Sequence, residues 1–233
     1  MNNMIETQNL SKEFHGRLAL KNVTMSVPEN CVYGLLGANG AGKSTLLKTM
    51  TGLLRPSGGE IRFQGHKWLR RDLTQIGALI ENPPIYENLT AWENMKVKAL
   101  LAGASDERIR EALEEAEIAD TGKKRAGAFS LGMKQRLGIA LALLGNPRLL
   151  VLDEPINGLD PLGIQKLRRL IRSFPEKGIT VIISSHILSE IQQTADYIGI
   201  IAKGELKYSG RVEEGENLEE LFLEIAAKGG EGR

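Results

Sequence analysis

Residues 37–45 read Gly-Ala-Asn-Gly-Ala-Gly-Lys-Ser-Thr, a pattern and spacing suited to binding phosphate groups. A short apolar run before this loop predicts a buried strand over residues 31–36, and the apolar residues after it predict a helix over residues 44–53. Glycines let backbone N–H groups turn toward an anion, and the start of a helix adds partial positive charge. Lys43 would neutralise phosphate charge, and the Ser44 hydroxyl would bind Mg²⁺. The alternative is a glycine turn that binds nothing, and both flanking elements argue against it.

Two carboxylates, Asp153 and Glu154, directly follow a predicted strand over residues 149–152. Parallel strands of α/β folds point their C-terminal ends at the ligand crevice, so we expect both side chains near the phosphate loop. Asp153 is then placed to bind Mg²⁺, directly or through water, and Glu154 is free to polarise a water beside the terminal phosphate. Without the phosphate loop, a helix cap or a solvated turn would be the simpler explanation of this pair.

Polar residues also stand at the ends of two other predicted elements. His186 follows an apolar run that predicts a strand ending at the same crevice, although a lone histidine there is often only a surface residue. Ser130 precedes an apolar helix and is a candidate N-cap, with Gly132 two residues later. Capping explains the serine but not the whole run of residues 129–136.

Composition and charge restrict the class of protein. The chain has 233 residues, enough for one large domain or a domain with an insertion. Its net charge of +1 does not favour a polyanionic partner such as nucleic acid. The single cysteine, Cys31, excludes an internal disulfide and suits a reducing compartment. The start has no signal pattern and no stretch reaches the ~18 apolar residues of a membrane span, so we expect a cytoplasmic chain that could still attach to a membrane surface.

The remaining pattern predicts an α/β fold with a mainly parallel central sheet, β-strands at the start and a helical insertion. The expected strands cover residues 18–27, 31–36, 60–63, 76–80, 149–152 and 180–183 and the hairpin 198–209. The expected helices cover residues 44–53, most of 90–144, a segment that begins after the N-cap Asp160, and an acidic segment around 218–225. We divide the chain into the first part of the nucleotide-binding core (1–84), the helical subdomain (85–146), the second part of the core (147–210) and a short helical tail (211–233).

Five segments, in this order and at this spacing, resemble the nucleotide-binding subunit of an ABC transporter. They are the phosphate loop, Ser130 with Gly132, Asp153 with Glu154, Gly158-Leu159-Asp160, and Ser185-His186. The resemblance covers almost the whole chain. It implies a P-loop NTPase core with a mainly parallel sheet, an N-terminal antiparallel β-subdomain and an inserted α-helical subdomain. It also implies hydrolysis of ATP with Mg²⁺ and an ATP bound between two copies that face each other head to tail.

The resemblance also implies a role for each matching position. Phe14 would stack on adenine, and a core strand residue is the alternative for this aromatic side chain. Glu154 would be the catalytic base, His186 would contact the terminal phosphate, and Asp160 would lie in a loop that crosses between the two subunits. The ATP-binding positions of the loop would be Gly37, Ala38, Asn39, Gly40, Ala41, Gly42, Lys43, Ser44 and Thr45.

Two positions depart from the common pattern of this family. The family signature Leu-Ser-Gly-Gly-Gln stands here as Phe-Ser-Leu-Gly-Met, which keeps Ser130 and Gly132 for the partner's terminal phosphate. Glu81 stands where most members have glutamine, and a carboxylate there adds negative charge and metal-ligand capacity. We therefore assign Glu81 to catalysis and to Mg²⁺. The alternative is an exposed loop residue of no special effect.

Both departures are similar to a bacterial subgroup that exports, or protects against, antimicrobial peptides such as lantibiotics and bacitracin. The implied partners are transmembrane permease subunits and a second copy of the chain, which would place it on the inner face of the cell membrane without nucleic acid. Residues 81–88 would pass motion to the permease. The alternatives are a soluble ABC-type ATPase that acts on ribosomes or DNA, and a nucleotide-gated scaffold without turnover, against which Glu154 argues.

Overall fold

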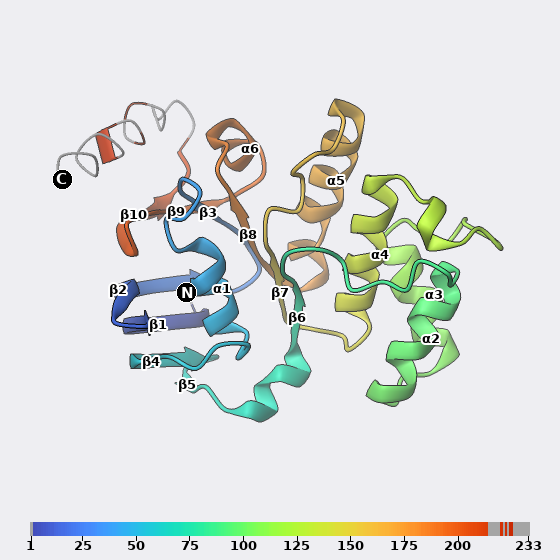
Figure 1. Ribbon diagram of the computed structural model, residues 1–233, viewed down its shortest axis with the longest axis horizontal. Helices are drawn as coiled ribbons and strands as arrows, with labels where there is room; N and C mark the ends of the chain where they lie inside the picture. Colours follow the sequence, from blue (N-terminus) through green and yellow to red (C-terminus); the bar gives the residue numbers. More distant parts are fainter. Residues whose placement is uncertain (1, 214–219, 221, 223, 226–233) are drawn as a thin grey trace.

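Strands and helices alternate along most of the chain, as the computed structural model shows (Figure 1). The structure describes residues 2–213, 220, 222, 224 and 225. Of the predicted acidic helix around residues 218–225, the structure describes residues 220, 222, 224 and 225, which are helical, and the rest of that segment lies outside the described residues, as does most of the predicted tail 211–233.

Two β-sheets form the framework. The smaller, four-stranded sheet is antiparallel and has the order β2-β1-β4-β5. Its strands are β1 (Asn3–Phe14), β2 (Arg17–Pro28), β4 (Gly58–Phe63) and β5 (His66–Lys67). The larger, six-stranded sheet has the order β10-β9-β3-β8-β7-β6, in which neighbouring strands are parallel except for the antiparallel pair of β9 and β10. Its strands are β3 (Val32–Leu36), β6 (Ile76–Leu79), β7 (Leu149–Leu152), β8 (Thr180–Ser185), β9 (Tyr197–Ala202) and β10 (Glu205–Arg211).

The helices connect and cover these strands. The α-helices are α1 (Lys43–Met50), α2 (Ala91–Ala102), α3 (Asp106–Glu115), α4 (Leu131–Leu143), α5 (Pro161–Ser173) and α6 (Leu188–Gln192). Short 3₁₀ segments cover Arg70–Gln75, Ala126–Ala128 and Pro175–Lys177. Four of the helices begin at side-chain caps that satisfy free backbone N–H groups: Thr90 for α2, Ser105 for α3, Ser130 for α4 and Asp160 for α5.

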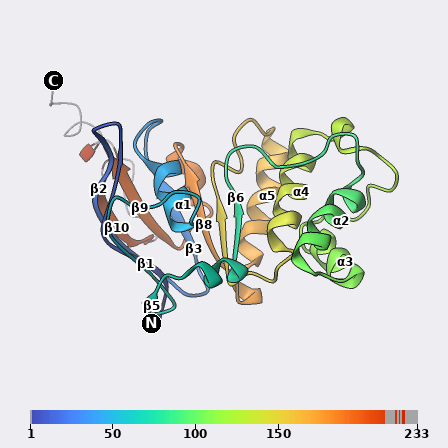
Figure 2. The same cartoon turned by 60° about the horizontal axis from the view of Figure 1, so that its bottom comes forward.

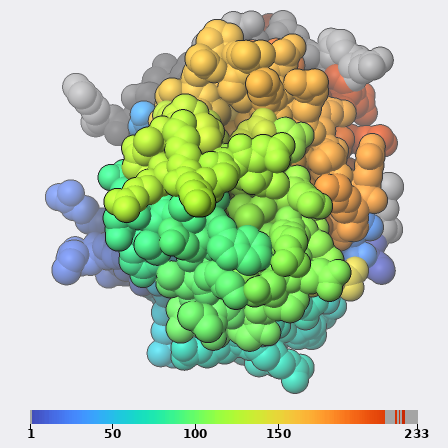
Figure 3. All heavy atoms as spheres, turned by 90° about the vertical axis from the view of Figure 1, so that its right-hand side faces the viewer, coloured from blue at the N-terminus to red at the C-terminus, as the bar shows by residue number. Residues whose placement is uncertain are grey.

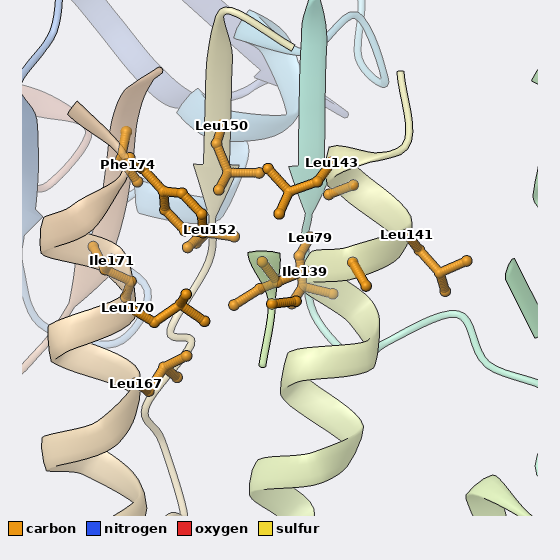
Figure 4. Close-up of a cluster of buried hydrophobic side chains, with 14 of the residues drawn as sticks. Leu79, Ile139, Leu141, Leu143, Leu150, Leu152, Leu167, Leu170, Ile171 and Phe174 are labelled. Atoms are coloured by element: carbon orange, nitrogen blue, oxygen red, sulfur yellow. The ribbon is translucent and has the colours of Figure 1, made fainter. Parts of the chain in front are cut away.

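The central sheet is buried on both faces, because successive side chains of a strand point to opposite sides. On β7, Leu149 and Val151 belong to an apolar cluster shared with α1 and the small sheet. Leu150 and Leu152 of the same strand belong to the cluster on the other face, shared with α4 and α5. Figure 4 shows this second cluster, where Leu152 lies between the side chains of the two helices. Packing on both faces therefore holds the strands of the central sheet in place, and with them the edge of the sheet at which the parallel strands end.

A layer of helices extends away from the central sheet at one end of the molecule (Figures 1 and 2). The helices α2 and α3 pack against α4 in this layer and form one broad face of the protein (Figure 3). The predicted α/β fold, with its mainly parallel sheet, antiparallel N-terminal sheet and helices around residues 90–144, is confirmed.

The predicted end of the first helix is wrong. We expected this helix to reach residue 53, but α1 ends at Met50. Gly52 has a left-handed backbone with φ 72°, a conformation that commonly ends helices. Leu53 consequently points to solvent, while Leu46, Leu47 and Met50 are buried.

Candidate functional site

The candidate residues follow the C-terminal ends of neighbouring parallel strands. The phosphate loop follows β3, His186 follows β8, Asp153 and Glu154 follow β7, and Glu81 follows β6 after one residue. Because parallel strands end at the same edge of a sheet, tertiary structure brings together segments that are far apart in sequence.

The phosphate loop joins β3 to the first turn of α1. Gly40 and Gly42 have φ of 80° and 113°, which glycine adopts without the steric cost that other residues meet. The loop lines a cavity of about 480 Å³. Its lining residues are Leu18, Ala19, Lys21, Asn39, Gly40, Gly42, Lys43, Ser44, Thr45, Glu154, Lys203 and Gly204. A concave site with backbone N–H groups at a helix start suits the phosphates of a nucleotide.

Lys43 is folded back onto this loop. Its Nζ donates to the carbonyl oxygens of Gly37 at 2.7 Å and Ala38 at 3.3 Å, and only 5% of the residue is exposed. The same ammonium lies 3.1 Å from Oε1 of Glu154. A buried lysine with a neighbouring carboxylate keeps its charge balanced, so the cation stays inside the cavity.

Glu154 lies between two basic side chains. Its Oε2 lies 2.9 Å from Nδ1 of His186, while its Oε1 faces Lys43. Its backbone has a left-handed φ of 48°, which is uncommon for a non-glycine residue and typical of functional turns. The Ser184 hydroxyl accepts from the Glu154 N–H at 2.9 Å and fixes this turn.

The Ser184 hydroxyl also donates to Oδ1 of Asp153 at 2.5 Å, so one buried serine orients both carboxylate residues. The sequence reasoning missed Ser184, although its hydroxyl at the end of an apolar strand was the available signal. Nearby, burial raises the pKa of the Glu190 carboxyl above its usual value, and a hydrogen bond from Ser185 opposes this shift.

The oxygen donors suit Mg²⁺. Ser44 offers a hydroxyl, Asp153 is a buried carboxylate, and Glu81 offers another carboxylate, all of them hard ligands of the kind that Mg²⁺ prefers. Within the described residues, no three His, Cys, Asp or Glu side chains gather closely enough to hold a metal by themselves. This arrangement fits Mg²⁺, which usually binds through one or two carboxylates together with waters and substrate phosphates.

Glu81 does not line the phosphate-loop cavity. Its carboxylate forms an ion pair with Nζ of Lys48 on α1, and its backbone has a left-handed φ of 65°. Lys48 is a second residue that the sequence reasoning missed, because its partner is 33 positions away.

Ser130, Gly132 and Asp160 line a different cavity, of about 770 Å³, together with Leu131, Met133 and the start of α5. The predicted N-cap is confirmed, because the Met133 N–H donates to the Ser130 hydroxyl at 3.3 Å. Asp160 caps α5 by accepting from the Gly163 N–H at 2.6 Å. The structure therefore separates the predicted site residues into two groups within one chain.

Phe14 ends β1 beside the turn that leads to β2. It is 39% exposed, so the alternative of a core strand residue is wrong. The ammonium of Lys12 lies 4.9 Å from the centre of its ring. Phe14 does not line the phosphate-loop cavity, whereas Leu18 and Ala19 at the start of β2 do.

Comparison with known proteins agrees with this geometry. The family model described as ABC transporter matches residues 20–157. The lantibiotic transport ATP-binding protein SrtF of Streptococcus pyogenes is 50% identical over 94% of this chain and 96% of its own length. The bacitracin transport ATP-binding protein BcrA of Bacillus licheniformis is 46% identical over 88% of this chain and 69% of its own length.

Solved structures of similar proteins have the same fold. An ATP-binding subunit of an ABC transporter is 31% identical, with a TM-score of 0.83 over 96% of this chain and 99% of its own. A dimeric ATP-binding cassette in a post-hydrolysis state, bound to ADP and phosphate, is 26% identical, with a TM-score of 0.78 over 90% of this chain and 99% of its own. In the segments that the structure describes, no helix has the length and apolar character needed to cross a bilayer. The chain therefore belongs to the ABC transporter family, as an ATP-binding subunit that hydrolyses ATP.

Proposed function

We propose that this ATPase powers the transport of antimicrobial peptides and so protects the cell that contains the ATPase against them. The observation that carries this proposal is the 50% identity to a lantibiotic transport protein over almost the full length of both chains. The similarity to a bacitracin transport protein supports the same class of substrate. The alternatives of a ribosome- or DNA-acting ATPase and of a scaffold without turnover are not favoured by these relatives.

At the catalytic site, residues 37–45 hold the phosphates of ATP. The Lys43 ammonium breaks its ion pair with Glu154 and neutralises phosphate charge instead. Glu154 is then free to accept a proton from the attacking water as the general base. The contact of 2.9 Å between Nδ1 of His186 and Oε2 of Glu154 supports a role for this histidine in orienting the base and contacting the terminal phosphate. Phe14, exposed at the end of β1, stacks on adenine.

Mg²⁺ would be held by Ser44 and Asp153, with Glu81 as a further oxygen ligand, and would neutralise charge on the phosphates. The hydrogen bond from Ser184 supports this assignment, because it leaves the second oxygen of the Asp153 carboxylate available. Glu81 would take part through the carboxylate oxygen that does not pair with Lys48.

Two copies of the chain face each other head to tail. The separation of Ser130, Gly132 and Asp160 from the phosphate loop supports this arrangement, since one chain alone does not gather both groups around one cavity. The N-terminus of α4, which carries Ser130 as its cap, suits the terminal phosphate of an ATP held by the partner.

Permease subunits in the membrane are the remaining partners, and they hold the chain on the cytoplasmic face. Residues 81–88, which include the exposed Tyr86, form the contact region on the side of the helical layer.

We divide the chain accordingly into core (1–84 and 147–210), helical subdomain (85–146) and tail (211–233). A net charge of +1 supports a complex without nucleic acid.

Deletion of the gene in its native host tests the proposal. The deletion strain should become more susceptible to lantibiotics or bacitracin, and the wild-type gene should restore resistance. A gene carrying Lys43→Ala should not restore it, because that chain lacks the phosphate-binding ammonium. Unchanged susceptibility to the whole panel would contradict peptide transport while leaving the ATPase assignment intact.

A further inference from the structure

The loop between β6 and α2, residues 80–90, connects two parts of the molecule. Its second half is attached to the helical layer. The Tyr86 N–H donates to Oδ1 of Asn94 at 2.7 Å, and the Glu87 carbonyl accepts from the Gly127 N–H at 2.8 Å. The Glu87 carboxylate also pairs with Nζ of Lys134 on α4 at 2.6 Å. This half of the loop therefore moves with α2 and α4.

The first half of the loop is attached differently. Among the described residues, the ion pair between Glu81 and Lys48 is the one hydrogen bond that joins residues 80–84 to α1. Glu81 stands at a left-handed φ of 65°, a backbone conformation that costs energy for a residue with a side chain. This unfavourable backbone conformation is explained if the protein needs the Glu81 carboxylate at this place beside α1.

Lys48 also stands in a defined relation to the proposed metal site. Ser44 and Lys48 are four residues apart on α1, so they are neighbours on one face of the helix, with Cβ atoms about 5–6 Å apart. The ammonium that pairs with Glu81 therefore extends from a position one helical turn along α1 from Ser44. Because the Glu81 side chain is 66% exposed, it would rotate freely into solvent without this partner.

We propose that Lys48 is a positioning residue for Glu81: its ammonium holds the carboxylate, and with it residues 80–84, against the face of α1 that carries Ser44. This inference rests on the proposed role of Glu81 toward Mg²⁺. The ion pair between Lys48 and Glu81 is then the charged contact that joins residues 80–84 to α1, the helix that begins at the phosphate loop. Movement of the helical layer then reaches α1 through Lys48.

The competing explanation is that Glu81 and Lys48 form an ordinary surface ion pair. The two explanations predict opposite changes in the Mg²⁺ requirement when Lys48 loses its charge. Removing a positive charge near a cation site lowers repulsion, so by Coulomb's law alone the site should need less Mg²⁺. Loss of a positioning residue should instead raise the Mg²⁺ requirement, because Glu81 is no longer held within reach. A rise that disappears in a Glu81→Gln background is therefore assigned to Glu81.

The first test uses hydrogen exchange in the nucleotide-free chain, so it does not depend on activity. Lys48→Met should speed exchange of the backbone amides in residues 80–85 by roughly two- to fivefold, the range expected for loss of a surface ion pair. Glu81→Gln should have the same effect, and the double variant should add nothing further, because both remove one interaction. Lys48→Arg should retain protection. Lys96→Met, which breaks an exposed ion pair with Asp106 in the helical layer, is the matched control and should leave this loop unchanged.

The second test measures the Mg²⁺ concentration for half-maximal ATP hydrolysis. Lys48→Met should raise it about two- to fivefold, as the loss of one surface ion pair allows, and should raise it no further in a Glu81→Gln background. Unchanged loop exchange in Lys48→Met, or a lowered Mg²⁺ requirement, overturns the inference. An unchanged requirement in Glu81→Gln alone would instead contradict the proposed role of Glu81 toward the metal.

Discussion

At the scale of single residues, the site is built from charges that must exchange partners. Glu154 faces both Lys43 and His186, and Lys43 is bonded to carbonyls of its own loop. These contacts balance the buried Lys43 ammonium and the partly buried Glu154 carboxylate, and in the proposed mechanism phosphate oxygens replace them. The identity of the base is therefore the assignment to test first.

Glu154→Gln should bind ATP but hydrolyse it about 10²–10⁴-fold more slowly, because an amide cannot act as a general base. The variant should accumulate as an ATP-held dimer, since closure depends on binding rather than on cleavage. Phosphate release and size-exclusion chromatography with ATP measure the two effects. Glu176→Gln, on an exposed 3₁₀ segment, is the control and should behave as wild type. Wild-type turnover in Glu154→Gln would exclude Glu154 as the base.

Two buried acids of the core should make the fold sensitive to alkali. Burial, reinforced by the charge of Asp196, raises the pKa of Cys31 to about 12, and burial raises the pKa of Tyr33 to about 12 as well. A raised pKa means that only the unfolded chain loses these protons between the ordinary and the raised value, so stability is present below that window and falls as pH rises through it.

The free energy of unfolding should therefore decrease from about pH 9 upward, with each group adding at most about 1.4 kcal/mol per pH unit. Urea unfolding at a series of pH values measures the slope. Cys31→Ala should flatten the curve from about pH 9, and Tyr33→Phe only from about pH 10, because a phenol in the unfolded chain ionises later. Identical slopes in wild type and Cys31→Ala would show that the thiol does not contribute.

At the scale of elements, contact between β6 and α4 sets the position of the helical layer. A Cβ atom on Gly77 of β6 would lie 2.4 Å from the Ala142 carbonyl oxygen of α4, which is closer than real atoms approach. On the same helix, a Cβ atom on Gly138 would meet Leu79 and Pro83 at 3.0 Å. Glycine at these positions lets the helix that carries Ser130 pack directly on the strand that leads to Glu81.

Gly77→Ala should destabilise the fold by about 1–3 kcal/mol, the usual cost of overpacking, because the backbone of α4 must move. The midpoint of urea unfolding measures the loss. Gly145→Ala is the matched control, since its Cβ atom would lie 3.6 Å from the nearest atom, the Thr74 carbonyl oxygen, in ordinary contact. Equal midpoints for the two variants would contradict this packing argument.

At the scale of the whole molecule, the proposed ATP site combines one cavity of one chain with the other cavity of a second chain. The phosphate loop and Glu154 line one cavity, and Ser130 and Gly132 line the other. A variant that damages one cavity should therefore be complemented by a variant that damages the other.

Ser130→Arg should block closure of the dimer and leave ATP affinity of the single chain nearly intact, whereas Lys43→Ala should weaken ATP binding itself. Each variant alone should fail to dimerise with ATP. A mixture should recover part of the ATP-dependent pairing, because each heterodimer contains one phosphate loop and one signature that are both intact. Chromatography with ATP measures this recovery. Identical binding defects in the two variants would indicate that Ser130 serves its own chain or only caps α4.

The sequence by itself determined the features that depend on neighbouring residues. The phosphate loop, the caps at Ser130 and Asp160, and the apolar strand before Asp153 are local patterns, because turns, caps and side-chain periodicity act over a few positions. The mainly parallel sheet followed from alternating strands and helices. The roles of Phe14 and Asp160 came from the family resemblance and remain predictions.

Only the tertiary structure decided the contacts between residues far apart in the chain. Ser184 bridges to Asp153 across neighbouring strands, and Lys48 meets Glu81 between a helix and a loop. The separation of Ser130 from the phosphate loop is of the same kind. No local pattern specifies such pairs, because they depend on the order of strands in the sheet and on how closely α4 packs against β6.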